Sequence, residues 1–424
     1  MSVVELKMLL LGERLGNGFV MYSETYDYTG PLAAMVYKWL DFIFGSSRWV
    51  HMIVSTFLII LQAGILNSIL LKNKAYEENN YIPAFLYAIL MSSTMDFFAL
   101  SPQLMSLTFV ILSLNQIFRR IDNVVTDELF LFAGIYTGLA TFCYLPAVIY
   151  FITFLLSFII FSTAALRRLI IFIYGFSMVF LVIGAYYFWY DSLDDMISIF
   201  IVGGFLKPKN FFVEYAELFQ ISYVILGVLF ISLTVFVTAR FTNFQQNMMR
   251  VMFLFIIAGV VAVIISPELS PAALQFIVPP LAFFLTHYFL TLKRKILRRL
   301  MPTLVVLALL LYPWFLRNQF EDFLIGEDRS LIKDKKVMLL GNDLMVYLGN
   351  EIASPFIDEY SSKEKLKGLD YFQQASALYE VILKSNPDVI IDDWNRVPDI
   401  FNRFPKIQHQ YKKGTYGYYW KINN

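Results

Sequence analysis

Long apolar stretches occupy most of the chain between residues 49 and 317, and they constrain the fold more than any other feature. A helix needs about 20 mostly apolar residues to cross a bilayer, and roughly ten stretches approach that length. They lie at about 49–71, 81–99, 100–118, 129–146, 147–163, 169–190, 221–241, 250–266, 272–292 and 300–317. The sequence therefore predicts a mostly α-helical, polytopic bundle of about ten transmembrane spans.

The composition supports a membrane protein and excludes a nucleic-acid binder. Hydrophobic residues make up 58% of the chain and charged residues only 16%, whereas soluble domains average about 45–50% and about 25%. The net charge of +1 offers no basic face for nucleic acid. The lone cysteine, Cys143, excludes a disulfide within the chain. Polar residues inside the spans, such as Gln62, are expected to bond across helices.

Basic residues fall at every second junction between the expected spans, which orients the bundle by the positive-inside rule. They are Lys72 and Lys74, Arg119 and Arg120, Arg167 and Arg168, Arg240 to Arg250, and the cluster KRKILRR at 293–299. This pattern places residues 1–48 and the C-terminal part outside. An external N-terminus is hard to translocate without a preceding span, so we expect an apolar helix of about 20 residues upstream of Met1. The alternative is a short N-terminal tail that the first hydrophobic helix carries across the membrane.

The chain divides into three expected domains: an external first loop with short helices at 1–48, a transmembrane helical domain at 49–317, and a small α/β domain at 318–424. In the last domain, 336–343, 388–393 and 415–422 have the pattern of strands, and 371–387 has that of an amphipathic helix. It contains no glycine-rich nucleotide-binding motif. We expect it to serve as an extracytoplasmic lid or acceptor-docking module.

The first loop has a recognisable order of motifs. Glu5 is followed by "GERLGNG" at 12–18, Tyr22, "DYTGPL" at 27–32 and "FGSS" at 44–47. This order resembles the GT-C superfamily, polytopic glycosyltransferases that include the protein mannosyltransferases and the lipid A aminoarabinose transferases. The whole chain looks still more like an uncharacterised bacterial family with this architecture. It departs from the GT-C pattern in lacking a helix before the loop, and in having Val4-Glu5 where Asp, often Asp-Glu, is usual.

The resemblance implies a membrane glycosyltransferase that takes a sugar from a polyprenyl-phosphate donor at the outer face of the bacterial cytoplasmic membrane. Sugar transfer to a hydroxyl needs a base, and a carboxylate in the first loop would serve. The candidate catalytic residues are Glu5, Glu13 and Asp27, with Glu5 favoured by the resemblance. The alternative is that Glu5, Glu13 and Arg14 are solvated loop charges.

Positive groups or a metal must also stabilise the departing phosphate. The candidate substrate-binding residues are Arg14, Arg48, His51, Asp96, Lys207 and Lys209. Asp96 stands near the outer end of a span, where an ionisable residue indicates function, although it could simply cap the helix that begins at Ser101-Pro102. A divalent cation is possible, and the sequence does not identify it.

Two other classes of function stay open. A non-catalytic membrane scaffold or envelope-assembly component would keep the GT-C shape without its chemistry, and the Val4-Glu5 departure favours this reading. A transporter is the third, but the sequence has neither inverted repeats nor several charges within the spans. Retention of "DYTGPL" beside the loop acids favours the enzyme.

Overall fold

The computed structural model divides into two compact units, and each is described by itself. It describes residues 3–77, 79–121, 126–162, 166–206, 241–320, 332–341, 343–357, 372–414 and 417–422, with residue 366 and short pieces within 210–234. The first unit comprises residues 1–50, 187–210 and 322–424. The second unit comprises residues 51–186 and 211–321.

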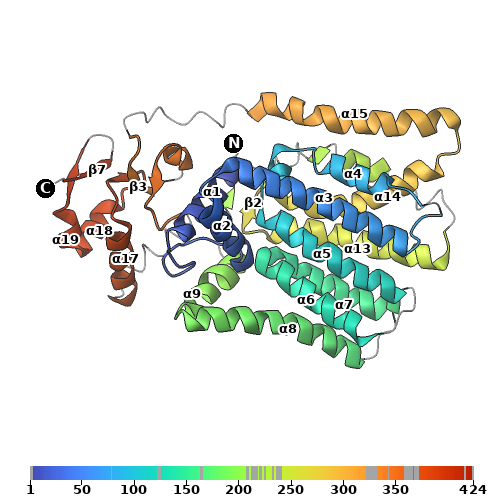
Figure 1. Cartoon of the computed structure of the whole chain (residues 1–424), viewed down its shortest axis with the longest axis horizontal. Helices are drawn as coiled ribbons and strands as arrows, with labels where there is room; N and C mark the ends of the chain where they lie inside the picture. The colour runs from blue at the N-terminus through green and yellow to red at the C-terminus, as the bar shows by residue number, and fades with distance from the viewer. Residues whose placement is uncertain are drawn as a thin grey trace. The chain divides into compact units, whose positions relative to one another are not determined.

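The second unit is a bundle of long apolar helices that lie side by side (Figure 1). Its helices are α3 (Arg48–Lys72), α4 (Ile82–Leu90), η1 (Met95–Phe98), α5 (Pro102–Ile121), α6 (Asp127–Cys143), η2 (Leu145–Ala147), α7 (Val148–Ser162), α8 (Leu166–Trp189), α13 (Asn243–Ile265), η4 (Pro271–Ile277), α14 (Val278–Thr291) and α15 (Lys295–Phe320). The short strands β1 (Asn210–Phe211) and β2 (Glu268–Leu269) complete the element order here. Most of the expected apolar spans are therefore helical.

Four helical stretches among the described residues are long and apolar enough to cross a membrane. They are Arg48–Lys72, Leu166–Trp189, Asn243–Ile265 and Pro271–Thr291. The expected total of about ten spans is not confirmed, and the expected span at 221–241 falls mostly outside the described residues. The chain has the composition and the helices of an integral membrane protein.

The expected span at 81–99 is wrong as a single helix. Helix α4 stops at Leu90, and a turn then leads to the short helix η1. Ser92, Ser93 and Thr94 stand at the break, and serine and threonine favour a continuing helix less than alanine or leucine does. The Ser92 hydroxyl donates to the Ala88 carbonyl at 2.8 Å.

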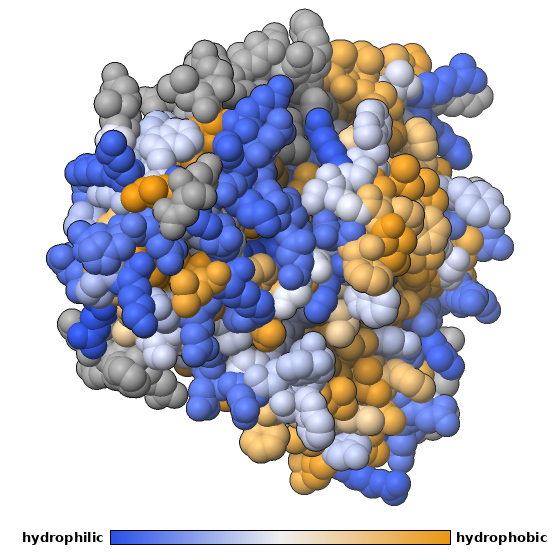
Figure 2. Space-filling model, turned by 60° about the vertical axis from the view of Figure 1, so that its left-hand side comes forward, coloured by the Kyte–Doolittle hydropathy of each residue, from blue (hydrophilic) through white to orange (hydrophobic). Residues whose placement is uncertain are grey.

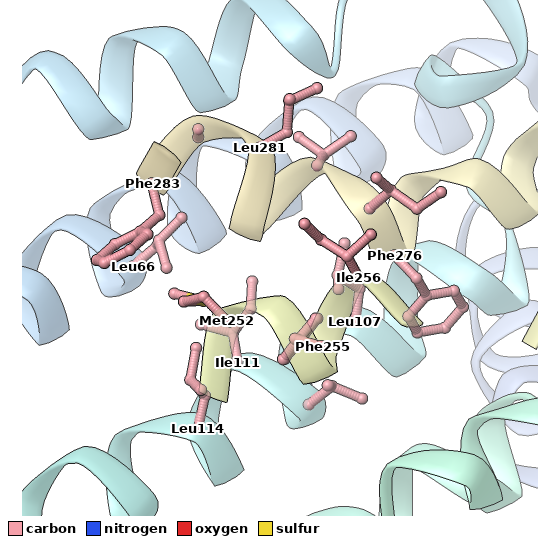
Figure 3. Close-up of a cluster of buried hydrophobic side chains, with 14 of the residues drawn as sticks. Leu66, Leu107, Ile111, Leu114, Met252, Phe255, Ile256, Phe276, Leu281 and Phe283 are labelled. Carbon is pink, nitrogen blue, oxygen red and sulfur yellow. The ribbon is translucent and has the colours of Figure 1, made fainter. Parts of the chain in front are cut away.

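The core of the second unit is a continuous cluster of buried aliphatic and aromatic side chains. In Figure 3, Leu66 from α3 and Ile111 from α5 lie close to Met252 and Phe255 from α13, and Phe283 from α14 lies beside Leu66. A buried polar network crosses this core. Gln62 Nε2 donates to the Leu104 carbonyl at 2.8 Å and the Tyr87 hydroxyl donates to Gln62 Oε1 at 2.6 Å, which confirms the expected interhelical role of Gln62.

Apolar side chains also cover broad areas of the surface (Figure 2). On α3 they include Ile53, Phe57 and Ile60, and on α8 they include Leu181 and Val182, all exposed. Soluble monomers rarely expose contiguous apolar patches beyond a few hundred Å². Helices that are apolar toward both the core and the outside are those that a bilayer surrounds.

Helices α6 and α8 approach closely because glycines line their contact. Gly134 and Gly138 form a G-x-x-x-G pair on α6, and Gly175 faces them from α8. A side chain at Gly134 would collide with the Phe172 carbonyl oxygen, and one at Gly175 would collide with the Leu131 carbonyl oxygen. This is the small-residue packing typical of membrane helices.

We therefore expect Gly134→Ala to destabilise the bundle by about 1–3 kcal/mol, the usual cost of overpacking a close contact. Thermal unfolding in detergent, followed by tryptophan fluorescence, measures the loss. Gly184→Ala on α8 is the matched control, because a methyl group there meets no atom within 4 Å. Equal stability of the two variants would contradict close packing at Gly134.

The first unit joins the N-terminal segment to the C-terminal α/β domain. Its elements are α1 (Val3–Gly16), α2 (Pro31–Phe44), α9 (Leu193–Met196), the π-helix η3 (Ile197–Gly203), α10 (Gly204–Leu206), β3 (Lys336–Leu340), η6 (Leu344–Tyr347), β4 (Glu351–Ile352), α17 (Phe372–Ser385), β5 (Val389–Asp392), α18 (Val397–Arg403), α19 (Pro405–Gln408), β6 (Tyr411–Lys413) and β7 (Tyr418–Lys421). Pro31 at the first turn favours the start of α2, and Gly45, with φ 68°, ends it.

The C-terminal domain contains a five-stranded mixed sheet in the order β4-β3-β5-β7-β6. Strand β3 pairs in parallel with β4 and β5, and β7 pairs antiparallel with β5 and β6. Helix α17, labelled in Figure 1, follows β4 and precedes β5 in the chain. The small C-terminal sheet and its helix follow the sequence prediction, which did not include β4 and β6.

Candidate active site on the N-terminal segment

Helix α1 brings charged residues into the interior of the first unit. Lys7 and Arg14 are fully buried, Glu5 is 8% exposed, and Asp27 on the following loop is also fully buried. A buried charge is costly unless it is paired. These residues are therefore part of the structure of the N-terminal segment, and the alternative of freely solvated loop charges does not apply to them.

Asp27 is held by a buried ion pair and by its own turn. Lys7 Nζ lies 2.7 Å from Asp27 Oδ2, with the two side chains 1% and 0% exposed. Asp27 Oδ1 accepts a hydrogen bond from the Thr29 amide at 2.7 Å, an Asx turn that leads into Gly30-Pro31 and helix α2. Asp27 is thus placed to hold the "DYTGPL" turn against α1.

Tyr22 fixes the same turn from the other side. Its φ of 71° is in the left-handed region that side chains other than glycine rarely adopt. Its hydroxyl donates to the Thr29 carbonyl at 2.7 Å, and its ring contacts those of Tyr187 and Phe200. The π-helix that carries Phe200 therefore packs on the turn that holds Asp27, and π-helical turns are frequent at functional sites.

Glu5 and Arg48 form the candidate pair that is accessible to a substrate. Arg48 Nε lies 2.9 Å from Glu5 Oε1, and the side chains are 50% and 9% exposed. Arg48 is the first residue of α3. A nearly buried carboxylate thus lies beside a half-exposed guanidinium. The carboxylate could receive a proton, and the guanidinium could bind a phosphate.

Glu13 connects α1 to the segment that follows α2 and to the C-terminal sheet. Its Oε1 accepts from the Ile352 amide at 3.1 Å, and its Oε2 accepts from the Ser46 hydroxyl at 3.3 Å. Burial raises the pKa of the Glu13 carboxyl above its ordinary value, and the nearby Asp41 and Glu351 act in the same direction. These contacts give Glu13 a structural position between three elements.

Arg14 contacts the C-terminal domain and, among the described residues, has no carboxylate within ion-pair distance. Its Nη2 donates to the Ser385 hydroxyl at 2.8 Å, and its guanidinium carbon lies 3.4 Å from the centre of the Phe19 ring. Burial lowers the pKa of Arg14 to about 10, so it stays charged at neutral pH. Lys384, which precedes Ser385, pairs with Glu24 at 2.7 Å. Arg14 therefore binds α17 and is not accessible to a substrate.

The remaining candidates belong to the second unit or fall outside the described residues. His51 and Asp96 belong to the second unit, where His51 is buried and Asp96 is half-buried in η1. The expected capping role of Asp96 falls to Ser101, whose hydroxyl accepts from the Leu104 amide at 3.1 Å. Lys207 and Lys209 lie outside the described residues. Within the described ranges, no group of three or more His, Cys, Asp or Glu side chains could hold a metal ion.

Lys7 is the residue that sequence reasoning missed. It is not among the sequence candidates, because its partner Asp27 is 20 residues away. The one local signal is its setting: Lys7 stands in "VVELKMLLLG", where the neighbours are apolar. A charge inside an apolar helical run needs a buried partner.

Comparison with known proteins gives a structural match. No family model and no curated protein matches the chain. Among solved structures, the crystal structure of ArnT from Cupriavidus metallidurans bound to undecaprenyl phosphate superimposes with a TM-score of 0.53 and 12% sequence identity. The match covers 95% of this chain and 84% of that one. The chain thus has an ArnT-like fold, which confirms the GT-C resemblance at the level of fold.

Proposed function

We propose that the chain is an integral-membrane glycosyltransferase that transfers a sugar from a polyprenyl-phosphate donor to an acceptor at the outer face of the bacterial cytoplasmic membrane. The observation that carries the proposal is the Glu5–Arg48 pair, on an ArnT-like fold. ArnT was crystallised with undecaprenyl phosphate, a lipid of the donor class proposed here. The sugar and the acceptor are not specified.

The proposed chemistry divides between the two members of the pair. Glu5 accepts the proton of the acceptor hydroxyl while that oxygen forms a bond to the anomeric carbon of the sugar. The bond from this carbon to the phosphate oxygen breaks, and the electron pair stays on the phosphate. Arg48 stabilises the resulting negative charge. Arg48 Nε lies 2.9 Å from Glu5 Oε1, so the proposed base and the proposed phosphate-binding cation stand side by side.

The other two acids take supporting roles in this proposal. Asp27, paired with Lys7, holds the turn that leads into α2, and Glu13 fastens α1 to β4. They orient the helix that carries Glu5 and do not touch the substrate. In this scheme residues 1–48 and 318–424 are external and 49–317 span the membrane, as the positive-inside pattern predicts.

One observation favours a non-catalytic scaffold as the second candidate. Each of Glu5, Glu13 and Asp27 already has a partner within the first unit, as structural residues would. The scaffold keeps the fold and uses these acids only for packing. The scaffold hypothesis predicts that no lipid-linked sugar is consumed, whereas the enzyme hypothesis predicts consumption. One assay therefore distinguishes the two candidate functions.

The assay uses the purified chain in vesicles that contain a radiolabelled undecaprenyl-phosphate-linked sugar. The enzyme should consume the lipid-linked sugar and release undecaprenyl phosphate when membrane extract supplies the acceptor. Heat-treated protein provides the background. An absence of consumption across the available lipid-linked sugars would favour the scaffold.

A further inference from the structure

The last 25 residues of the chain differ in charge from the rest. Residues 400–424 contain five lysine or arginine residues and no aspartate or glutamate, whereas the whole chain has 34 basic and 33 acidic residues. Arg403, Lys406, Lys412 and Lys413 are exposed, and within the described residues none of these four forms an ion pair. A surface of one sign attracts ligands of the opposite sign. This part of the C-terminal domain therefore favours an anionic partner.

The β6–β7 hairpin combines these cations with aromatic rings. Lys412 pairs with Trp420 across the hairpin, and directly opposite residues of an antiparallel pair project on the same face of the sheet. Tyr418 stands two residues before Trp420 in β7, so it projects on that face too. Both aromatic residues are partly exposed. This face therefore presents two aromatic rings beside a lysine.

Gly414 keeps one edge of the Trp420 indole free of a side chain from β6. A side chain at position 414 would begin 3.0 Å from Trp420 Cδ1 and Nε1. The Gly414 amide donates to the Tyr418 carbonyl at 2.7 Å, so the glycine is held in place beside the two rings. Any larger residue at this position would stand against the indole.

Strand β6 forms the open edge of the five-stranded sheet. The order of the strands puts β4 at one edge and β6 at the other. At the β4 edge, the Ile352 amide donates to Glu13 Oε1 at 3.1 Å, so α1 occupies that edge. At the β6 edge, Lys412 and Lys413 are exposed. Lysines on an edge strand also discourage pairing between sheets, but that role needs no aromatic rings beside them.

Aromatic rings and cations together match the chemistry of an acidic carbohydrate. The C–H groups on the face of a sugar ring form an apolar surface that stacks on tyrosine or tryptophan, and its hydroxyl groups bond to amide side chains. Gln408, at the end of α19, and Gln410, just before β6, are exposed. Ionised groups on the sugar would pair with lysine. A lipid surface fits less well, because the exposed side chains of residues 406–413 are all polar.

We propose that the hairpin surface, formed by Lys412, Tyr418 and Trp420, binds an acidic glycan. The inference deepens the proposed function and rests on it, because it identifies the class of acceptor that receives the sugar. The residues of the hairpin surface hold the glycan and take no part in the transfer itself.

Binding of labelled oligomers tests the inference. The whole chain is placed in nanodiscs of phosphatidylcholine, which has no net charge, and three fluorescein-labelled probes are compared by fluorescence anisotropy. Oligogalacturonate supplies sugar rings and carboxylates, a maltooligosaccharide of equal length supplies the rings alone, and oligoglutamate supplies the carboxylates alone. We expect oligogalacturonate to bind with a Kd lower by about tenfold or more, because each of the other probes lacks one kind of contact.

Each other outcome of this comparison contradicts the inference. Equal affinity for oligoglutamate would mean that charge alone is recognised, as for an acidic polypeptide. Equal affinity for the maltooligosaccharide would exclude a preference for acidic glycans. If phosphatidylglycerol in the nanodiscs abolished binding of oligogalacturonate, anionic lipid would be the occupant of the surface. An absence of binding by all three probes would remove the surface as a glycan site.

Substitutions locate the binding on the hairpin surface. Trp420→Ala should weaken oligogalacturonate binding by about tenfold, as the loss of an aromatic anchor often does. Lys412→Gln should weaken it by about two- to fivefold, the effect of losing one exposed ion pair. Lys335→Gln is the matched control, because Lys335 is an exposed lysine next to β3, away from the hairpin. Its affinity should equal that of the wild type.

Gly414→Thr tests the same surface without removing the indole. Its side chain would stand against Trp420 and should weaken oligogalacturonate binding, so the inference stays testable even where Trp420→Ala lowers the unfolding temperature. Wild-type affinity in both Lys412→Gln and Gly414→Thr would overturn the assignment to the hairpin. The binding assay contains no sugar donor, so its failure is distinct from a failure to consume lipid-linked sugar.

Discussion

Replacing Glu5 by glutamine is expected to reduce sugar transfer by about 10²–10⁴-fold, the usual effect of removing a general base. Glutamine keeps the shape of the side chain and an oxygen that accepts from Arg48 Nε, but it cannot take a proton at neutral pH. The stability of the protein should change little, because Arg48 is half-exposed and such ion pairs contribute about 0–1 kcal/mol. Consumption of lipid-linked sugar in vesicles measures the rate, and thermal unfolding measures the stability.

Glu380→Gln is the matched control for this experiment. Glu380 is exposed on α17, and surface substitutions usually change stability by less than about 0.5 kcal/mol. Both the rate and the unfolding temperature should stay at the wild-type level. Turnover of Glu5→Gln equal to that of the control would remove Glu5 from the mechanism. Glu13 would then become the candidate general base, because burial raises the pKa of its carboxyl.

The helices could be predicted from the sequence because a membrane span leaves a strong local signal. A run of about 20 apolar residues usually forms a membrane-spanning helix. Helices α3, α8 and α13 lie at such runs. The failure at 81–99 has a local cause, because average hydropathy does not register the lower helix propensity of Ser92 and its neighbours. The close packing at Gly134 could not be predicted from local hydropathy, because it depends on where α8 passes.

The site was harder to predict than the helices. The motif order identified Glu5, Asp27 and Arg48 as residues of interest, but it did not identify which side chains pair. Pairing depends on how α1 folds back against the loop, and the partner of a charge is not encoded in the residues next to it. Lys7 shows this most clearly, because its partner Asp27 follows 20 residues later. Arg14 shows it too, since Ser385 belongs to the C-terminal domain.

The second large effect is expected at the buried pair. Lys7→Met should lower the free energy of unfolding by about 3–5 kcal/mol, the typical cost of removing one partner from a buried ion pair. Methionine fills much of the space of the lysine stem, so the loss comes mainly from the Asp27 carboxylate left buried without its cation. Both side chains have at most 1% exposure, so water cannot replace the lost partner. Unfolding in detergent, followed by tryptophan fluorescence, measures the change.

The double variant Lys7→Met with Asp27→Asn separates charge from packing. Asparagine can still accept the Thr29 amide that now bonds to Asp27 Oδ1 at 2.7 Å, and it carries no charge that needs a partner. The double variant should therefore be more stable than either single variant, because a pair of neutral groups avoids the desolvation penalty of an isolated ion. If the two single effects simply add in the double variant, Lys7 and Asp27 are not energetically coupled, and the turn before α2 is held by other contacts.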